Sequence, residues 1–246
     1  MKSLHISVSP EPIAHLFGIT ITNSLLTSII VMLLLLFLAL MFRLKKPFPK
    51  AKLPLIVEMI IEGFYGFIKK IAGDRVDSLF PLLFTFFIFI IMGNWIGLLP
   101  GVGSIGIWEE VENGRKLVPI LRGPNTDLSA TIALALISVG VTQYLSVEAL
   151  GLKGYVSRFI NLKNPIKFFV GILDTISEFA KILSFSFRLF GNIFAGEVLI
   201  SVMIFLIPVL IPVPFLILEV FVGFIQALVF TMLSTIFIVV ATEEHH

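Results

Sequence analysis

The sequence contains no cysteine among its 246 residues, and this absence removes several kinds of chemistry. A chain without thiols forms no disulfide, holds no metal through thiolates and has no cysteine nucleophile. Its histidines stand near the two ends, at positions 5, 15, 245 and 246, whereas a metal site needs clustered ligands. Neither a His-Glu-x-x-His nor a Gly-x-Ser-x-Gly motif occurs, so we predict no enzyme, no metal site and no cofactor.

Charged residues are also scarce, since they make up 14% of the chain while hydrophobic residues make up 57%. The apolar residues follow one another in long uninterrupted runs, whereas an amphipathic helix of a soluble bundle carries them on one face. We therefore predict an all-α membrane protein, a single integral membrane domain over 1–246 that contacts lipid and no nucleic acid. The predicted membrane segments are 20–42, 79–99, 127–150, 165–207 and 215–241.

The charges between these segments indicate the topology. Basic residues and two prolines at 43–52 end the first segment, and basic residues return at 153–167, which marks both connections as cytoplasmic. Five crossings then place the N-terminus outside and the C-terminus in the cytoplasm. The stretch 54–72 mixes glutamate and lysine with apolar residues, a pattern that predicts a helix lying along the cytoplasmic membrane surface.

Proline is absent between positions 166 and 207, which predicts one long unbroken helix. At a rise of 1.5 Å per residue such a helix extends about 60 Å, whereas the hydrocarbon layer is only about 30 Å thick. The helix must therefore tilt or bend. Because Pro208, Pro212 and Pro214 reverse the chain before the last segment, we predict that the two final segments form a strongly tilted hairpin.

One arginine, Arg188, lies inside this long apolar segment. Exposing an arginine to lipid costs about 2.5 to 3.5 kcal/mol on insertion scales, so its surroundings are predicted to be protein or trapped water. On a helical wheel, Glu197 falls about 180° away from Arg188 and must serve a different neighbour. A stripe of polar and small residues lies within about 40° of the arginine: Asp174, Ser177, Lys181, Ser184, Asn192 and Ala195.

The last segment carries a second set of polar residues, since Glu219, Gly223, Gln226 and Phe230 share one helical face. A carboxyl group on a membrane-buried polar path can take up and release a proton, whereas an arginine keeps its charge. We therefore predict that Glu197 and Glu219 exchange protons and that Arg188 is a fixed electrostatic gate. For Asp174 and Lys181 a second interpretation stays open, because near the headgroups snorkelling alone explains a charged side chain.

The run Ser-Phe-Arg-Leu-Phe-Gly-Asn-Ile-Phe-Ala-Gly-Glu at 186–197 resembles the signature of subunit a of the rotary ATP synthase membrane sector. The run Pro-Asn-Thr-Asp-Leu at 124–128 and the spacing from Glu219 to Gln226 extend the resemblance. It implies that Arg188 faces the carboxylate of a rotating ring of c subunits and separates two aqueous half-channels.

By the same resemblance Asn192 and Gln226 lie near the arginine, while Glu197 and Glu219 line one half-channel and Asp174 lies toward the cytoplasmic exit. The implied protein is a non-catalytic, ion-translocating stator subunit of a bacterial plasma (inner) membrane, which couples proton motive force to ATP synthesis. Its implied partners are the c-subunit ring, the peripheral-stalk b subunits and, indirectly, the soluble catalytic sector.

Three alternatives to this function stay open on the sequence alone. A sodium-translocating form of the same subunit would carry its discriminating ligands largely on the ring. A secondary transporter would be expected to show internal repeats around a midplane site, and no repeat is visible here. A structural assembly protein would tolerate neutral substitutions at Arg188 and Glu197.

Overall fold

The computed structural model describes residues 9–16, 19–44, 52–99, 101–102, 105–111, 114–160, 165–207 and 211–242. The basic connection at 45–51, Pro208 and the terminal histidines lie outside these ranges. Helices dominate the described chain: α1 Asn23–Leu44, α2 Lys52–Ala72, η1 Gly73–Arg75, α3 Val76–Gly97, η3 Pro124–Thr126, α4 Leu128–Phe159, α5 Pro165–Leu206 and α6 Pro212–Thr242. Within it, five helical stretches are long and apolar enough to cross a membrane. The predicted class, an all-α membrane protein, is confirmed.

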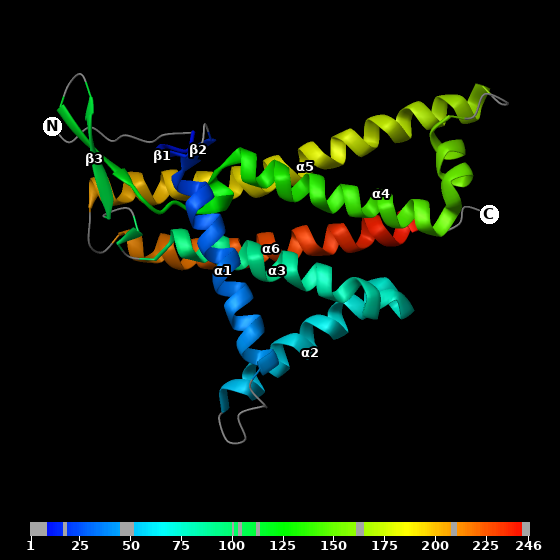
Figure 1. The fold of residues 1–246 in the computed structure, drawn as a ribbon, viewed down its shortest axis with the longest axis horizontal. Coiled ribbons are helices and arrows are strands. Elements are labelled where there is room, and N and C mark those ends of the chain that lie inside the picture. The colour runs from blue at the N-terminus through cyan, green and yellow to red at the C-terminus, as the bar shows by residue number, and fades with distance from the viewer. Residues whose placement is uncertain are drawn as a thin grey trace.

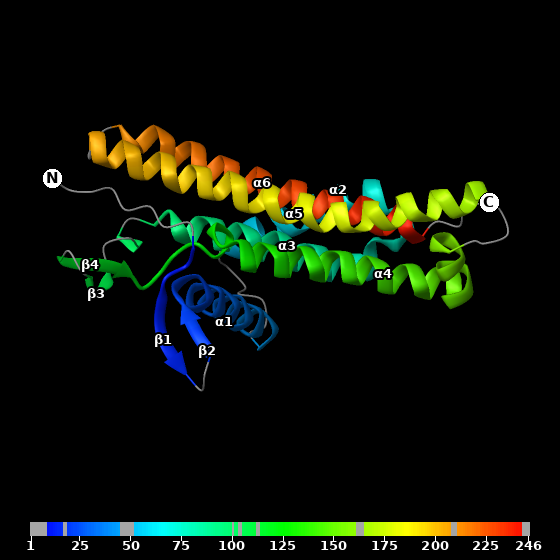
Figure 2. The ribbon, with the colours of Figure 1, turned by 90° about the horizontal axis from the view of Figure 1, so that it is seen from above.

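Four of the helices form one elongated bundle. Figure 1 and Figure 2 show α3, α4, α5 and α6 running alongside one another, with α5 and α6 as an antiparallel hairpin at one side. Helix α1 crosses the bundle at a steep angle, on the side opposite α5 and α6 (Figure 2). Helix α5 has 42 residues without interruption, as the absence of proline predicts. At 1.5 Å per residue it extends about 63 Å, twice the thickness of a hydrocarbon layer.

Aromatic side chains join α2, α3, α5 and α6 in the core. Phe64 of α2 stacks on Phe87 of α3 with ring centroids 4.4 Å apart. Phe230 of α6 lies 4.8 Å from Phe185 of α5 and 5.7 Å from Phe86 of α3. Such tilted and edge-to-face pairs add to the gain from burying the rings, so these helices are held at fixed spacing.

A buried amide network locks the segment before α4 into the bundle. The Asn125 side-chain amide nitrogen donates to Asn94 Oδ1 at 2.7 Å and to the Ile90 carbonyl at 3.2 Å. Asn94 in turn donates to the Gly223 carbonyl of α6 at 2.9 Å. Helix α4 then begins at Asp127, whose carboxylate accepts from the Ser129 backbone N–H at 2.9 Å. This is the capping role that the residue's position predicts.

Two short antiparallel hairpins depart from the sequence-based expectation. The first pairs β1 Pro12–Leu16 with β2 Ile19–Thr22, so α1 begins at Asn23 rather than at position 20. The second pairs β3 Gly106–Val111 with β4 Gly114–Pro119 in the connection between the predicted segments 79–99 and 127–150, where no strand was predicted. Mixed charges hide the alternation of a strand in the second region.

Helix α4 contains a kink directly after the predicted end at position 150, and a second helical stretch continues from there to Phe159. The kink lies at Gly151, where φ is 70° and ψ is 158°, outside the helical region. Only glycine adopts this conformation readily, and here it redirects the helix instead of ending it. The redirected turn places Arg158 against α5, where it becomes part of a polar cluster.

We expect Gly171→Ala to destabilise the protein, because a Cβ at this position would overlap the Phe159 carbonyl. Backbone atoms cannot move aside as the end of a side chain can, so α4 and α5 would have to separate. Overpacking of this kind costs about 1 to 3 kcal/mol, measured as a lower unfolding temperature in detergent. Gly140→Ala is the matched control, because nothing lies within 4 Å of its added Cβ. Equal unfolding temperatures for the two variants would contradict this packing.

Candidate functional site

Arg188 projects from the exposed face of α5, near its middle. Its Nη2 donates to Ser184 Oγ at 2.9 Å, one helical turn away. Within the described part of the chain, no carboxylate forms an ion pair with Arg188. The predicted stripe lies on the same open face, since Ser177, Ser184, Asn192 and Ala195 are all exposed. The positive charge is therefore directed away from the bundle.

Asn192 connects this exposed stripe to α6. Its side-chain amide donates to Gln226 Oε1 at 2.6 Å. Gln226 is buried together with Glu219, Gly223 and Phe230, the other members of the predicted face. The structure thus brings Asn192 and Gln226 together, one turn along α5 from Arg188.

Glu219 is 6% exposed and lies between α6 and α5. Its carboxylate occupies the space beside Gly196 that any side chain at that position would fill. The Glu219 carboxylate packs against the backbone of α5 at Gly196, and Glu197 is the next residue of α5. The two predicted proton-exchanging acids therefore lie at the same level of α5.

Glu197 forms an ion pair that sequence analysis missed. Its Oε2 lies 3.1 Å from Nη2 of Arg122, a residue of the segment that precedes α4. Arg122 lies in the connection between the predicted segments 79–99 and 127–150, where no site residue was predicted. No helical period relates positions 122 and 197, and the available signal was a basic residue two positions before the run at 124–128. As predicted, Glu197 and Arg188 serve different neighbours.

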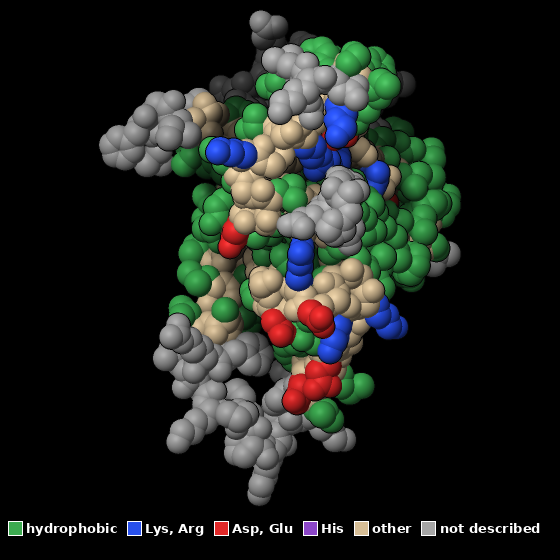
Figure 3. Space-filling model, turned by 90° about the vertical axis from the view of Figure 1, so that its right-hand side faces the viewer, with side chains coloured by type: hydrophobic (Ala, Val, Ile, Leu, Met, Phe, Trp, Pro, Cys, Tyr) green, Lys and Arg blue, Asp and Glu red, His purple; other side chains and the backbone are tan. Residues whose placement is uncertain are grey.

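Asp174 belongs to a separate cluster, fourteen residues or about 21 Å from Arg188 along α5. Arg158 Nε lies 3.1 Å from Asp174 Oδ2, and its Nη2 lies 3.9 Å from Glu178 Oε1. Glu178 also pairs with Lys181 Nζ at 2.7 Å and accepts from Gln143 at 2.6 Å. These charges are bound within the protein, which favours an organised site over simple snorkelling. Figure 3 shows acidic and basic side chains gathered on this end of the molecule.

Along α5, the site residues thus fall into three levels. Glu197 and Glu219 lie at one level, Arg188 about 13 Å further along, and Asp174 lies beyond it. The first group lies toward the β-hairpins and the last toward the C-terminal end of α6 (Figure 1). An exposed cation therefore separates two sets of acids that lie toward opposite ends of the bundle.

The sequence profile of a family described as "ATP synthase A chain" matches residues 25–239. The chain belongs to this family. The match includes every predicted site residue as well as Arg122. It makes the protein a multi-pass, membrane-sector subunit of ATP synthase, and such a subunit is not itself the catalytic one.

Individual members of the ATP synthase A chain family are similar along most of their length. The ATP synthase subunit a of Moorella thermoacetica is 33% identical over 238 residues, which cover 97% of this chain and 99% of that protein. The chloroplastic subunit a of Oedogonium cardiacum is 36% identical over 202 residues, or 79% of this chain and 73% of that protein. The chloroplastic protein of Stigeoclonium helveticum is also 36% identical, over 82% of this chain and 76% of its own length. The predicted family is therefore confirmed.

Proposed function

We propose that this chain is the ion-translocating stator subunit of a rotary ATP synthase. It provides two half-channels through which protons reach and leave the carboxylates of a rotating c-subunit ring, and Arg188 separates them. The observation that carries the proposal is the exposed Arg188, which Ser184 orients but which no carboxylate of the described chain neutralises. A cation of this kind within a membrane helix needs an external anion.

Arg188 acts through a charge that it cannot lose. A ring carboxylate that approaches it is held in its ionised form, and so gives up its proton before passing. Protons cannot then move directly from one half-channel to the other. The ring must turn for each proton that crosses, and one charge moving through 100 mV supplies about 2.3 kcal/mol.

The two half-channels follow the levels of α5. Glu197, Glu219, Asn192 and Gln226 form the proton path on the side of the β-hairpins, and Asp174 marks the cytoplasmic exit. This arrangement needs the α5–α6 hairpin to lie strongly tilted. The steep angle of α1 supports the tilt, because its 22 residues extend about 33 Å and suit a perpendicular crossing.

The remaining assignments follow from this orientation. The N-terminus lies outside and the C-terminus in the cytoplasm of a bacterial plasma membrane, and residues 1–246 form a single integral domain. The c ring contacts the α5–α6 face, while the peripheral-stalk b subunits hold the protein still against the soluble catalytic sector. The chain catalyses no covalent step of its own.

A photocrosslinking experiment tests the proposed ring contact. Because the chain has no cysteine, Phe187→Cys can carry a single thiol-linked photocrosslinker next to Arg188. We expect it to crosslink to the c subunit in the intact complex. The matched control is Leu36→Cys on α1, since both side chains are 54% exposed and α1 lies on the side of the bundle opposite α5 (Figure 2). A ring that copurifies yet crosslinks equally to both positions, or to neither, would contradict the proposal.

A further inference from the structure

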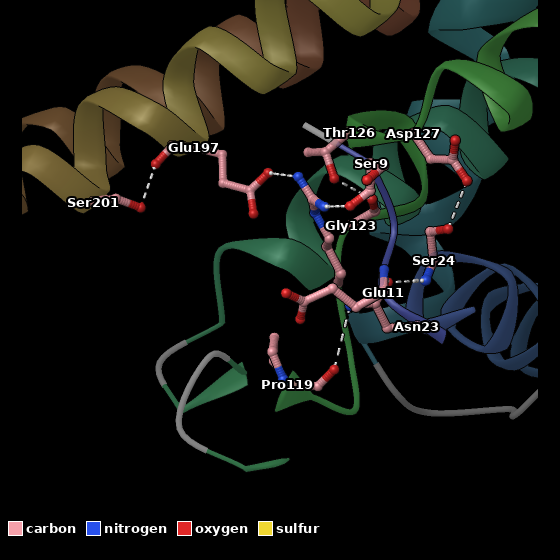
Figure 4. A network of polar contacts seen from close by, with 11 residues as sticks. Ser9, Glu11, Asn23, Ser24, Pro119, Gly123, Thr126, Asp127, Glu197 and Ser201 are labelled. Atoms are coloured by element: carbon pink, nitrogen blue, oxygen red, sulfur yellow. Dashed lines mark hydrogen bonds and ion pairs between the residues drawn. The ribbon is translucent and has the colours of Figure 1, made fainter. Parts of the chain in front are cut away.

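Arg122 is the centre of a polar network between the N-terminal segment, α1, the start of α4 and α5 (Figure 4). Its Nη2 donates to Glu197 Oε2 at 3.1 Å, and its Nη1 donates to the Ser9 carbonyl at 3.1 Å. Its backbone N–H donates to Thr27 Oγ1 of α1 at 3.2 Å. Contacts from three directions thus fix both the backbone and the guanidinium of this arginine.

The burial of the two partners is unequal. The Arg122 side chain is 7% exposed, whereas that of Glu197 is 37% exposed. Taking an arginine out of water is costly unless hydrogen bonds and a counter-charge compensate it. Arg122 is therefore a rigid and permanent cation, while the carboxylate that it holds keeps an accessible side. A merely structural ion pair has no need of this accessible side.

The other charged groups around the pair are acidic. Glu219 of α6 lies against Gly196, next to Glu197 in the sequence, and Glu11 of the N-terminal segment is part of the same network (Figure 4). Nearby negative charges favour the protonated form of a carboxyl group, and a bound guanidinium favours the ionised form. Among the described residues, Arg122 is the cation that forms an ion pair with Glu197. Arg188 does not reach Glu197, because it lies on the opposite face of α5.

We propose that Arg122 is a positioning residue of the proton path, which holds the Glu197 carboxylate in place on the face of α5 away from Arg188. The inference deepens the proposed function and depends on it. Glu197 can then receive a proton from the aqueous side and pass it on, because one side of its carboxylate is held by Arg122 while its side chain stays 37% exposed. The arginine itself takes up and releases no proton.

Passive proton flux through vesicles stripped of the soluble sector tests this role. We expect Arg122→Gln to lower the flux at neutral pH at least fivefold and to change its pH profile, because the Glu197 carboxylate loses the cation that positions it. Arg122→Lys is expected to retain most of the flux. In a Glu197→Gln background, Arg122→Gln is expected to cause no further change. Wild-type flux and pH profile in Arg122→Gln would overturn the inference.

A charge exchange separates positioning from simple structural support. If Arg122→Gln fails to assemble, the double variant Arg122→Glu with Glu197→Arg keeps an ion pair between the same segments. We expect it to restore assembly with the c ring but to leave the flux at least fivefold below wild type, since α5 then carries no carboxylate at 197. Recovery of both assembly and flux would show a structural role and overturn the inference. Arg75→Gln is the control, because Arg75 binds Thr242 of α6 outside this network.

Vesicles that retain the soluble sector keep the two proposals distinguishable. ATP-driven proton pumping in Arg188→Ala reports on the gate, whatever Arg122 does. Pumping that survives in Arg188→Ala would remove the proposed function and this inference with it. Loss of pumping in Arg188→Ala, together with a wild-type pH profile in Arg122→Gln, would remove only the role of Arg122.

Discussion

Arg188→Ala is expected to abolish coupled ATP synthesis while leaving the complex assembled. The guanidinium contacts Ser184 within its own helix and packs into no core of the described chain, so little folding energy depends on it. Without the cation, a ring carboxylate can pass between the half-channels still protonated. Protons then cross without turning the ring, and the free energy of the gradient is lost.

The measurement is ATP synthesis in membrane vesicles under an imposed proton gradient, with ring copurification as the test of assembly. We expect synthesis at the level of uncoupled vesicles. Ser177→Ala removes another polar side chain from the same exposed stripe and is expected to keep synthesis near wild type. Substantial coupled synthesis in Arg188→Ala would count decisively against an electrostatic gate, and against the proposed function as a whole.

Sequence analysis predicted the helices well because their cause is local. Apolar runs require lipid, and the proline-free stretch requires one long helix, so α5 and its hairpin with α6 followed directly. The need of Arg188 for surroundings of protein or water was also predictable, because an arginine in an apolar helix is costly to expose to lipid. The contact between Asn192 and Gln226 was expected from the family resemblance, whereas their spacing along two separate helices does not reveal it.

The features that sequence analysis missed depend on contacts between distant segments. Arg122 reaches Glu197 across 75 positions, and it does so because the segment before α4 is held by Asn125 and Asn94. The kink at Gly151 is a second example, since a glycine at the end of an apolar run is equally compatible with a helix end. Both features depend on how distant segments pack together in three dimensions, and the spacing of residues along the sequence does not show this.

Gly196 is a third residue whose contact could not be predicted from the sequence, because it leaves the space that the Glu219 carboxylate occupies. Any Cβ at this position would overlap the Glu219 carboxylate. That carboxylate ends a flexible side chain, so it can rotate away without separating α5 from α6. Gly196→Ala is therefore expected to displace the Glu219 carboxylate more than it destabilises the packing of α5 against α6.

We expect Gly196→Ala to lower proton flux about tenfold or more, which corresponds to about 1.4 kcal/mol on the barrier, with normal assembly. Gly191→Ala, in the same helix but with open space around its Cβ, is expected to have no such effect. Glu219→Asp in the Gly196→Ala background shortens the acid by one methylene group and should recover part of the flux. Full flux in Gly196→Ala alone would mean that protons do not pass by Glu219, because a displaced acid cannot serve an unchanged path.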